Sequence, residues 1–274
     1  MKTFSDKDAM RAHVRALKRA GKSVGCVLTM GYLHEGHIGL VHECARHVDA
    51  VVASIFVNPT QFGEKEDLDA YPTDIEGDLR KFEAAGVDAV FLPTPAEMYG
   101  EGAQTTVEVA ELSGILQGRV RPGHFQGVTT VVTKLFNIFE PDVTVFGEKD
   151  YQQLAIIRRM VRDLASPISV LGLPIVREPD GLAMSSRNVR LTPEDRRAAT
   201  ILCKALDAAD AALGPDATAE SLRRLVRDTI QREPRADIRA IDIRDAATLA
   251  PYYGPIDTRA VILLSVRFGE ILSI

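Results

Sequence analysis

Two histidines three residues apart are the first feature of the sequence that suggests chemistry. His34 and His37 lie in the segment Thr29–His37, directly after an apolar run. Side chains three apart share one side of a helical turn, so both imidazoles can face one ligand. The start of a helix offers free N–H groups and a partial positive charge, and Gly36 permits close approach to the backbone. The pattern predicts a phosphate site. A helix-capping loop with two surface histidines is the alternative.

Clustered histidines also raise the question of zinc. His37, His42 and His47 recur at intervals of five residues, whereas a helical ligand pair needs an interval of four. No cysteine or acidic residue nearby completes a tetrahedral set. The spacing therefore argues against a zinc site.

A second candidate phosphate segment is Gly181–Asn188 (GLAMSSRN). The hydroxyl groups of Ser185 and Ser186 can bond phosphate oxygens, and the Arg187 guanidinium can bind them in a bidentate manner. A serine-containing linker between two domains is the alternative interpretation of the same residues.

The elements that must position these segments alternate between strands and helices. Apolar, β-branched runs predict strands at 24–30, 50–57, 87–92, 143–146 and 168–171, and helices are predicted at 36–47, 74–85, 129–139 and 151–164. Continuous apolar strands separated by helices indicate a parallel sheet that is covered on both faces. Ligands in such sheets bind at the carboxyl ends of the strands, where the histidine segment lies.

The pattern changes after residue 173. Helices are predicted at 193–213, which Gly214 and Pro215 end, and at 218–231, and strands at 238–243, at 260–266 and in a short terminal run. We therefore expect an α/β fold: a Rossmann-like parallel sheet with helices on both faces, plus a smaller C-terminal α+β domain. The expected domains are 1–175, which binds the nucleotide and its co-substrate, and 176–274, which acts as a lid.

Composition and charge limit the function classes. The 274 residues include 33 Lys+Arg and 38 Asp+Glu, a net charge of −5, with 46% hydrophobic residues. These values exclude a disordered or collagen-like chain and argue against a nucleic-acid partner. Three cysteines without a CxxC pair fit a reducing compartment. The strongest apolar run, 48–57, is shorter than the roughly 20 residues of a bilayer span, and no signal peptide is recognised. We expect a cytoplasmic, soluble protein without a membrane partner.

Several motifs together carry a family resemblance. His34–His37 fits the HxGH pattern of nucleotidylyltransferases and class I aminoacyl-tRNA synthetases, and Met184–Arg187 is similar to their KMSKS loop, although the lysines are not kept. Between these two lie, in order, Phe56–Phe62 (FVNPTQF), Arg121–Phe125 (RPGHF) and Phe146–Leu154 (FGEKDYQQL). With the Thr-Met-Gly that begins at Thr29, this set resembles the pantothenate synthetase family, the AMP-forming pantoate–β-alanine ligases.

The resemblance implies an ATP-dependent ligase of pantothenate and coenzyme A biosynthesis. (R)-Pantoate and ATP would give pantoyl adenylate and pyrophosphate, and β-alanine would then give pantothenate and AMP. Adenylation is chemically reasonable because a free carboxylate has too basic a leaving group for attack by an amine. The implied partners are the small-molecule substrates ATP, pantoate and β-alanine, Mg²⁺ accompanying ATP, and a second copy of the chain in a homodimer.

The resemblance also assigns roles to residues. His37, His34 and Lys149 are implied to be catalytic, with His37 stabilising the departing pyrophosphate, with or without proton transfer. Gln61 and Gln153 are implied to bind pantoate, and Gln61 also β-alanine. The implied ATP-binding set consists of Met30, Gly31, Tyr32, Leu33, His34, Glu35, Gly36, His37, Gly147, Glu148, Lys149, Asp150, Val176, Met184, Ser185, Ser186 and Arg187.

Four further residues have weaker assignments. Asn58, Arg121 and His124 are candidate contacts to substrate or phosphate, and Asp78 is a candidate carboxylate beside Mg²⁺. Each has a structural alternative. Asn58 can simply end a strand, Arg121 and His124 can form a basic surface loop, and Asp78 can lie on a solvated helix face. Lys149 can likewise be a surface lysine at a helix start, with Asp150 as its N-cap.

Competing functions come from the same superfamily and beyond it. A different adenylyl- or cytidylyltransferase would share HxGH, but the segments around Asn58 and Lys149 speak against it. An aminoacyl-tRNA synthetase lacks support because no basic appendage for tRNA is found. A catalytically silent nucleotide-binding module is disfavoured because the set of phosphate and substrate motifs is complete, and His34, His37 and Lys149 are all present.

Overall fold

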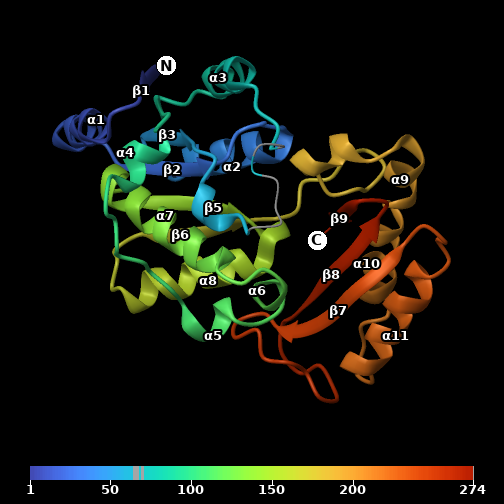
Figure 1. Ribbon diagram of the computed structural model, residues 1–274. Coiled ribbons are helices and arrows are strands. Elements are labelled where there is room, and N and C mark those ends of the chain that lie inside the picture. The colour runs from blue at the N-terminus through green and yellow to red at the C-terminus, as the bar shows by residue number, and fades with distance from the viewer. Residues whose placement is uncertain (64–67, 69–70, 274) are drawn as a thin grey trace. The chain divides into compact units, whose positions relative to one another are not determined.

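The protein is described by a computed structural model covering residues 1–63, 68 and 71–273 (Figure 1). The chain divides into two compact units. Unit 1 comprises residues 1–148 and 152–174, and unit 2 comprises residues 149–151 and 175–274. A six-stranded parallel sheet lies in unit 1 and a three-stranded antiparallel sheet in unit 2, which confirms the predicted fold class.

In the sheet of unit 1, successive strands are added on one side of β2 (Val24–Thr29) in the first half of the chain and on its other side from β5 (Val143–Gly147) onward, so the order of addition reverses at β2. The other strands are β1 (Lys2–Phe4), β3 (Ala50–Ile55), β4 (Ala89–Phe91) and β6 (Ser169–Leu173), and the order in the sheet is β1-β4-β3-β2-β5-β6. β2 pairs with β3 on one side and with β5 on the other. Open α/β sheets bind their ligands at such a reversal, beyond the carboxyl ends of the two central strands.

Helices cover both faces of this sheet. The first face packs against α1 (Lys7–Arg19), α7 (His124–Phe139) and α8 (Tyr151–Asp163), and the second against α2 (Glu35–Ala45) and α3 (Ile75–Ala84). Alternate residues of a strand point to opposite faces, so Cys26 joins the first core and Val27 the second. The longest described helix, α7, has 16 residues. No helix in the described part of the chain is long and apolar enough to cross a membrane.

Unit 2 packs helices on its antiparallel sheet. It contains α9 (Pro193–Ala198), α10 (Ile201–Ala211), α11 (Ala219–Ile230), β7 (Asp237–Asp245), β8 (Ala260–Phe268) and β9 (Ile271–Ser273). The prediction of one helix over 193–213 is wrong: the helix is interrupted at Ala199 and Thr200 and ends at Ala211. The Thr200 hydroxyl donates to the Arg197 carbonyl at 2.8 Å, and such local bonding competes with helix continuation.

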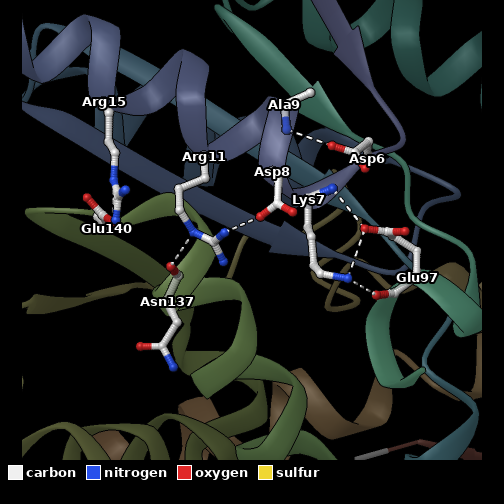
Figure 2. Close-up of polar contacts among 9 residues, drawn as sticks. All are labelled: Asp6, Lys7, Asp8, Ala9, Arg11, Arg15, Glu97, Asn137 and Glu140. Atoms are coloured by element: carbon white, nitrogen blue, oxygen red, sulfur yellow. Dashed lines mark hydrogen bonds and ion pairs between the residues drawn. The ribbon is translucent and has the colours of Figure 1, made fainter. Parts of the chain in front are cut away.

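Helix α1 was not predicted, although the sequence contains its signals. Asp6 caps the helix by accepting from the Ala9 N–H at 2.7 Å, and Met10 and Val14 are fully buried one turn apart. Figure 2 shows Arg15 donating to Glu140 and the Lys7 backbone donating to Glu97. The ion pair of Arg15 with Glu140 is exposed and contributes little, so burial of the apolar stripe is the main contribution that holds the helix.

Four short elements of unit 1 also escaped prediction. They are β1, α4 (Pro95–Tyr99), α5 (Ala110–Ser113) and α6 (Gln117–Val120). Segments of three to five residues carry too few positions for a periodic pattern. Only α4 has a recognisable start, because Thr94 caps it and proline occupies its first position.

His13 on α1 generates a prediction about acid stability. Its ring stacks on Phe4 with centroids 5.2 Å apart, and its Nε2 is buried without a hydrogen-bond partner among the described residues. Burial, aided by Lys2, lowers the pKa of His13 below the ordinary 6.5, while Asp88 acts in the opposite direction. The folded state therefore resists a proton that the unfolded chain accepts. The resulting stabilisation is present above the ordinary pKa and is lost as the pH falls through the lowered one.

We expect the free energy of unfolding to fall between about pH 7.5 and about pH 5, and His13→Phe to reduce that fall. Urea denaturation across this pH range is the measurement. His42→Gln, at an exposed position on α2, is the control and should keep the wild-type pH dependence. Equal pH dependence in His13→Phe and the wild type would contradict the prediction.

Candidate active site

The turn between β2 and α2 is held by a buried carboxylate from another helix. Gly31 and Tyr32 both have positive φ, +88° and +53°, a conformation that costs a residue other than glycine of order 1 kcal/mol. Asp78 on α3 is fully buried, and its two oxygens accept from the N–H groups of Tyr32 and Leu33, each at 2.7 Å. The stabilisation from two charge-assisted hydrogen bonds exceeds the conformational free-energy cost of the strained turn.

Lys81, one turn further along α3, strengthens the same attachment. Its Nζ donates to the Leu33 carbonyl at 2.6 Å. Asp78 thus binds the N–H groups of Tyr32 and Leu33, and Lys81 binds the carbonyl of Leu33. Helix α3 therefore fixes where the histidine motif begins.

The candidate role of Asp78 beside Mg²⁺ does not fit this geometry. Both carboxylate oxygens are engaged with backbone N–H groups, and the side chain has no exposed surface. Among the residues that the structure describes, no group of three His, Cys, Asp or Glu residues is placed to hold a metal ion. The geometry supports a positioning role for Asp78.

His34 and His37 form a reciprocal cap at the start of α2. The His34 Nδ1 accepts from the Gly36 N–H at 3.1 Å, and the His37 Nδ1 accepts from the His34 N–H at 3.2 Å. The two rings lie 4.1 Å apart, centroid to centroid. A nitrogen that accepts carries a lone pair, so each neutral ring has its proton on Nε2. Each imidazole therefore has an Nε2–H donor.

This arrangement differs from the expectation of free backbone N–H groups at the helix start. The Gly36 N–H bonds to the His34 ring, and the His37 N–H bonds to the His34 carbonyl at 2.8 Å. The histidines themselves consume these donors. The remaining ring protons of the motif are those on Nε2, and they lie beside the positive end of the helix dipole.

A buried amide network follows β3. Asn58 and Gln61 are 1% and 9% exposed. The Asn58 Nδ2 donates to Gln61 Oε1 at 3.1 Å and to the Gly127 carbonyl at 3.2 Å, while Gln61 Nε2 contacts Met30 Sδ at 3.2 Å. The contact of Gln61 with Met30 brings together two predicted site residues from the ends of neighbouring strands.

His124 links α7 to the same segment. Its Nδ1 bonds to the Gln61 carbonyl at 2.8 Å, and its Nε2 lies 3.3 Å from the Arg121 guanidinium. A carbonyl only accepts, so the His124 Nδ1 carries the proton and its Nε2 accepts from Arg121. Arg121 and His124, predicted together, are therefore coupled to Gln61 through its backbone.

Gly127 allows α7 to approach this segment closely. A Cβ at that position would lie 2.4 Å from the Thr60 carbonyl oxygen, inside any normal contact. Because the obstacle is backbone, it cannot move aside as a flexible side chain would. Glycine is thus required where α7 crosses the turn η1 (Pro59–Gln61).

Gln152 and Gln153 on α8 have different environments. Gln152 is 3% exposed, donates to the Leu112 and Ile115 carbonyls at 2.9 and 2.8 Å, and accepts from the Gln117 N–H at 3.1 Å. Its amide therefore secures the segment of α5 and α6. Gln153 is half-buried, so its amide is the more accessible one of the pair.

The remaining predicted residues belong mostly to unit 2. Gly147 ends β5 and Glu148 begins the turn η2 (Glu148–Asp150), both still in unit 1. Lys149 and Asp150 follow within unit 2, where the Lys149 Nζ lies 3.6 Å from Asp150 Oδ1.

The second motif sits on a small hairpin of unit 2. The Met184 N–H donates to the Val176 carbonyl at 3.0 Å, which brings these two predicted residues together. Ser185 caps the turn η3 (Ser186–Arg190) by accepting from the Arg187 N–H at 3.2 Å. Arg187 makes no ion pair with any residue the structure describes, so its guanidinium is available to an anion.

Several contributing residues were missed by the sequence reasoning. Lys81, Tyr99 and Gln152 act through contacts with residues distant in the chain. Thr60 bonds to Asn58, two residues earlier, inside a motif that was recognised. Gln152 lies inside a motif that was recognised, and its burial alone distinguishes it from Gln153.

The chain is similar to known proteins over almost its whole length. The family model described as pantoate-beta-alanine ligase matches residues 2–274. A pantothenate synthetase of Bartonella henselae is 51% identical over 96% of this chain and 93% of its own length. One of Syntrophotalea carbinolica is also 51% identical, over 98% of this chain and 95% of its own.

Solved structures show the same likeness. The pantothenate synthetase of Thermus thermophilus has a TM-score of 0.94 and 45% identity, covering 100% of this chain and 97% of its own. The pantoate-beta-alanine ligase of Francisella tularensis, complexed with beta-gamma ATP and beta-alanine, has a TM-score of 0.79 and 31% identity, covering 99% and 95%.

The attachment of the first motif to α3 predicts the effect of Asp78→Asn. The NH₂ group of the new asparagine faces a backbone N–H that the carboxylate oxygen used to accept, so two donors oppose each other. We therefore expect the free energy of unfolding to fall by about 1–3 kcal/mol. ATP-dependent activity should fall as well, because the histidines lose their support.

Urea denaturation and turnover are measured together for this variant. Asp74→Asn, on the cap of the same helix, keeps an oxygen that can accept from the Gly77 N–H and is the control for charge removal. An Asp78→Asn variant with wild-type stability and turnover would contradict the positioning role.

Proposed function

This chain belongs to the pantoate–β-alanine ligase family, and we propose that it condenses (R)-pantoate with β-alanine at the expense of ATP. The products are pantothenate, AMP and pyrophosphate, and pantoyl adenylate is the intermediate. The ligands named for the Francisella relative are a nucleotide and the amine of this reaction.

One observation of the geometry carries the proposal. The two Nε2–H imidazoles of His34 and His37 follow β2, at the reversal of the sheet between β2 and β5. Donors at that position suit a nucleotide phosphate chain whose charge changes during reaction. Within unit 2, Ser185, Ser186 and Arg187 carry further groups of the kind that bind phosphate.

In the first step a carboxylate oxygen of pantoate attacks the α-phosphorus of ATP. The bond from that phosphorus to the bridging oxygen breaks, and pyrophosphate leaves with the electron pair. We propose that His34 and His37 donate hydrogen bonds to the phosphates and that the Lys149 ammonium adds positive charge. A neutral His37 that gave up its only ring proton would become an imidazolate, so the tautomer supports charge stabilisation over proton transfer.

In the second step the β-alanine amine attacks the acyl carbon of pantoyl adenylate. A C–N bond forms, the C–O bond to AMP breaks, and the nitrogen loses a proton. We propose that Gln61 and Gln153 hold pantoate through both steps and that Gln61 also contacts β-alanine. Because Gln61 Oε1 accepts from Asn58, Gln61 offers its N–H group to oxygen atoms of these substrates.

The other assignments enter as parts of the same proposal. Residues Met30–His37, Gly147–Asp150, Val176 and Met184–Arg187 bind ATP, while Asn58, Arg121 and His124 support the substrate side. Mg²⁺ accompanies the ATP phosphates, which together with water supply most of its ligands. Residues 1–175 bind the nucleotide and pantoate, and residues 176–274 form the lid. We further propose a cytoplasmic homodimer.

A substrate-omission assay tests the reaction. With ATP, pantoate and β-alanine all present, we expect pantothenate and AMP in equal amounts, and no AMP release when β-alanine is left out. Mass spectrometry of the products is the measurement. An enzyme that releases a nucleotide-containing product from ATP and another acceptor, without β-alanine, would establish a different nucleotidylyltransferase instead.

His37 variants test the charge-stabilising role. His37→Ala should lower the adenylation rate by about 10²–10³-fold, the usual effect of removing one donor to a developing charge. Pantoate affinity should stay within about twofold, because the interaction is made in the transition state.

His37→Gln keeps an N–H donor without an acidic proton and should retain more adenylation activity than His37→Ala. Single-turnover pyrophosphate release measures the rate, and calorimetry measures pantoate binding. Equal loss in both variants would favour proton transfer, and an unchanged rate in His37→Ala would exclude the role of His37 altogether.

A further inference from the structure

We propose that Tyr99 is a positioning residue, whose hydroxyl sets the direction in which the Gln61 amide faces the substrates. This inference rests on the proposed function, in which Gln61 binds pantoate. Tyr99 lies at the end of α4, outside every motif recognised in the sequence. It acts through Asn58 and touches no substrate itself.

The hydroxyl of Tyr99 bonds to the buried Asn58 amide. It donates to Asn58 Oδ1 in the shortest of the contacts at that oxygen. Thr60 adds its hydroxyl at 2.9 Å and its N–H at 3.4 Å. The Thr60 hydroxyl also lies 3.0 Å from the Tyr99 hydroxyl. Because Tyr99 uses its only proton on Asn58, the single proton of Thr60 is donated either to Asn58 Oδ1 or to the Tyr99 oxygen.

These donors determine which end of the Asn58 amide faces which way. Oδ1 faces three donor contacts, and Nδ2 faces the Gly127 carbonyl and Gln61 Oε1, at 3.2 and 3.1 Å. A reversed amide would place its NH₂ group against the Tyr99 and Thr60 donors and its oxygen against a carbonyl. In a site that is almost fully buried, such mispairing is unfavourable.

The orientation of Asn58 decides that of Gln61. Since Asn58 Nδ2 donates, Gln61 must meet it with Oε1, and the NH₂ group of Gln61 then lies on the side of Met30. A relaxed Asn58 would let Gln61 turn its oxygen toward the anionic carboxylate of pantoate. The hydroxyl of Tyr99 therefore favours pantoate binding from two hydrogen bonds away.

The surroundings of Tyr99 keep the hydroxyl in its donor form. Burial raises the pKa of Tyr99, outweighing the bonds to Thr60 and Asn58 that act to lower it. The phenol therefore keeps its proton at neutral pH. The ring is held independently of the hydroxyl, 6.4 Å from the Phe56 ring and 5.7 Å from the Lys134 ammonium, so Tyr99→Phe removes the donor and preserves the packing.

The test is the pattern of Michaelis constants in Tyr99→Phe. We expect the KM for pantoate to rise about tenfold, the effect of one lost hydrogen bond, while the KM for ATP stays within about twofold. A purely structural defect would change both constants alike. Tyr252→Phe removes a hydroxyl that bonds to Thr258 in unit 2 and should leave both constants within about twofold.

A second variant tests the same chain of bonds without altering the aromatic ring. Thr60→Val removes another donor to Asn58 Oδ1 and should raise the KM for pantoate in the same direction, to a smaller extent. Unchanged pantoate constants in both variants, or equal changes for ATP and pantoate, overturn the proposal. Failure of the wild type to form pantothenate would instead reject the proposed function, so the two failures are distinguishable.

Discussion

The fully buried carboxylate of Asp78 is the interaction on which the candidate site depends most directly. It holds two consecutive backbone N–H groups just before the histidine motif, in a turn with two positive φ angles. A buried charge is tolerated only when it is fully bonded, so turn and carboxylate stabilise one another. Because α3 packs on the second core of the sheet, that core also determines where His34 and His37 lie.

The proposed substrate side of unit 1 depends on a comparable constraint, the close crossing of α7 over the turn after β3. Gly127 allows the helix to approach the Thr60 carbonyl, and this close approach lets the Gly127 carbonyl accept from Asn58 Nδ2. His124, one turn earlier, bonds to the Gln61 carbonyl. One helix thus orients the backbone of Gln61 at one point and its side chain, through Asn58, at another.

Local patterns in the sequence were enough to predict five of the six strands of the parallel sheet and the loop that carries the histidines. β3 is apolar except for Ser54 and is buried along its whole length, which is the pattern expected of a strand covered on both faces. The boundaries of short elements and the break at Thr200 were not predictable, because single side-chain bonds decide them. The supporting contacts were also not predictable: Asp78 was singled out only as a candidate carboxylate beside Mg²⁺, and Tyr99 was not singled out at all. Asp78 and Tyr99 contact residues 46 and 41 positions away, and only the folded chain brings these partners together.

The net charge of −5 does not prevent the protein from binding anionic substrates, because acceptor atoms of the candidate site in unit 1 are already hydrogen-bonded to donors of the protein itself. The Nδ1 atoms of His34 and His37 accept from backbone N–H groups, and Gln61 Oε1 accepts from Asn58. Each group is left with a donor, Nε2–H of an imidazole or N–H of an amide. Neutral donors bind phosphate and carboxylate oxygens without the desolvation cost of a buried cation. In the proposed function, the selectivity of unit 1 for anions therefore arises from hydrogen-bond direction as much as from charge.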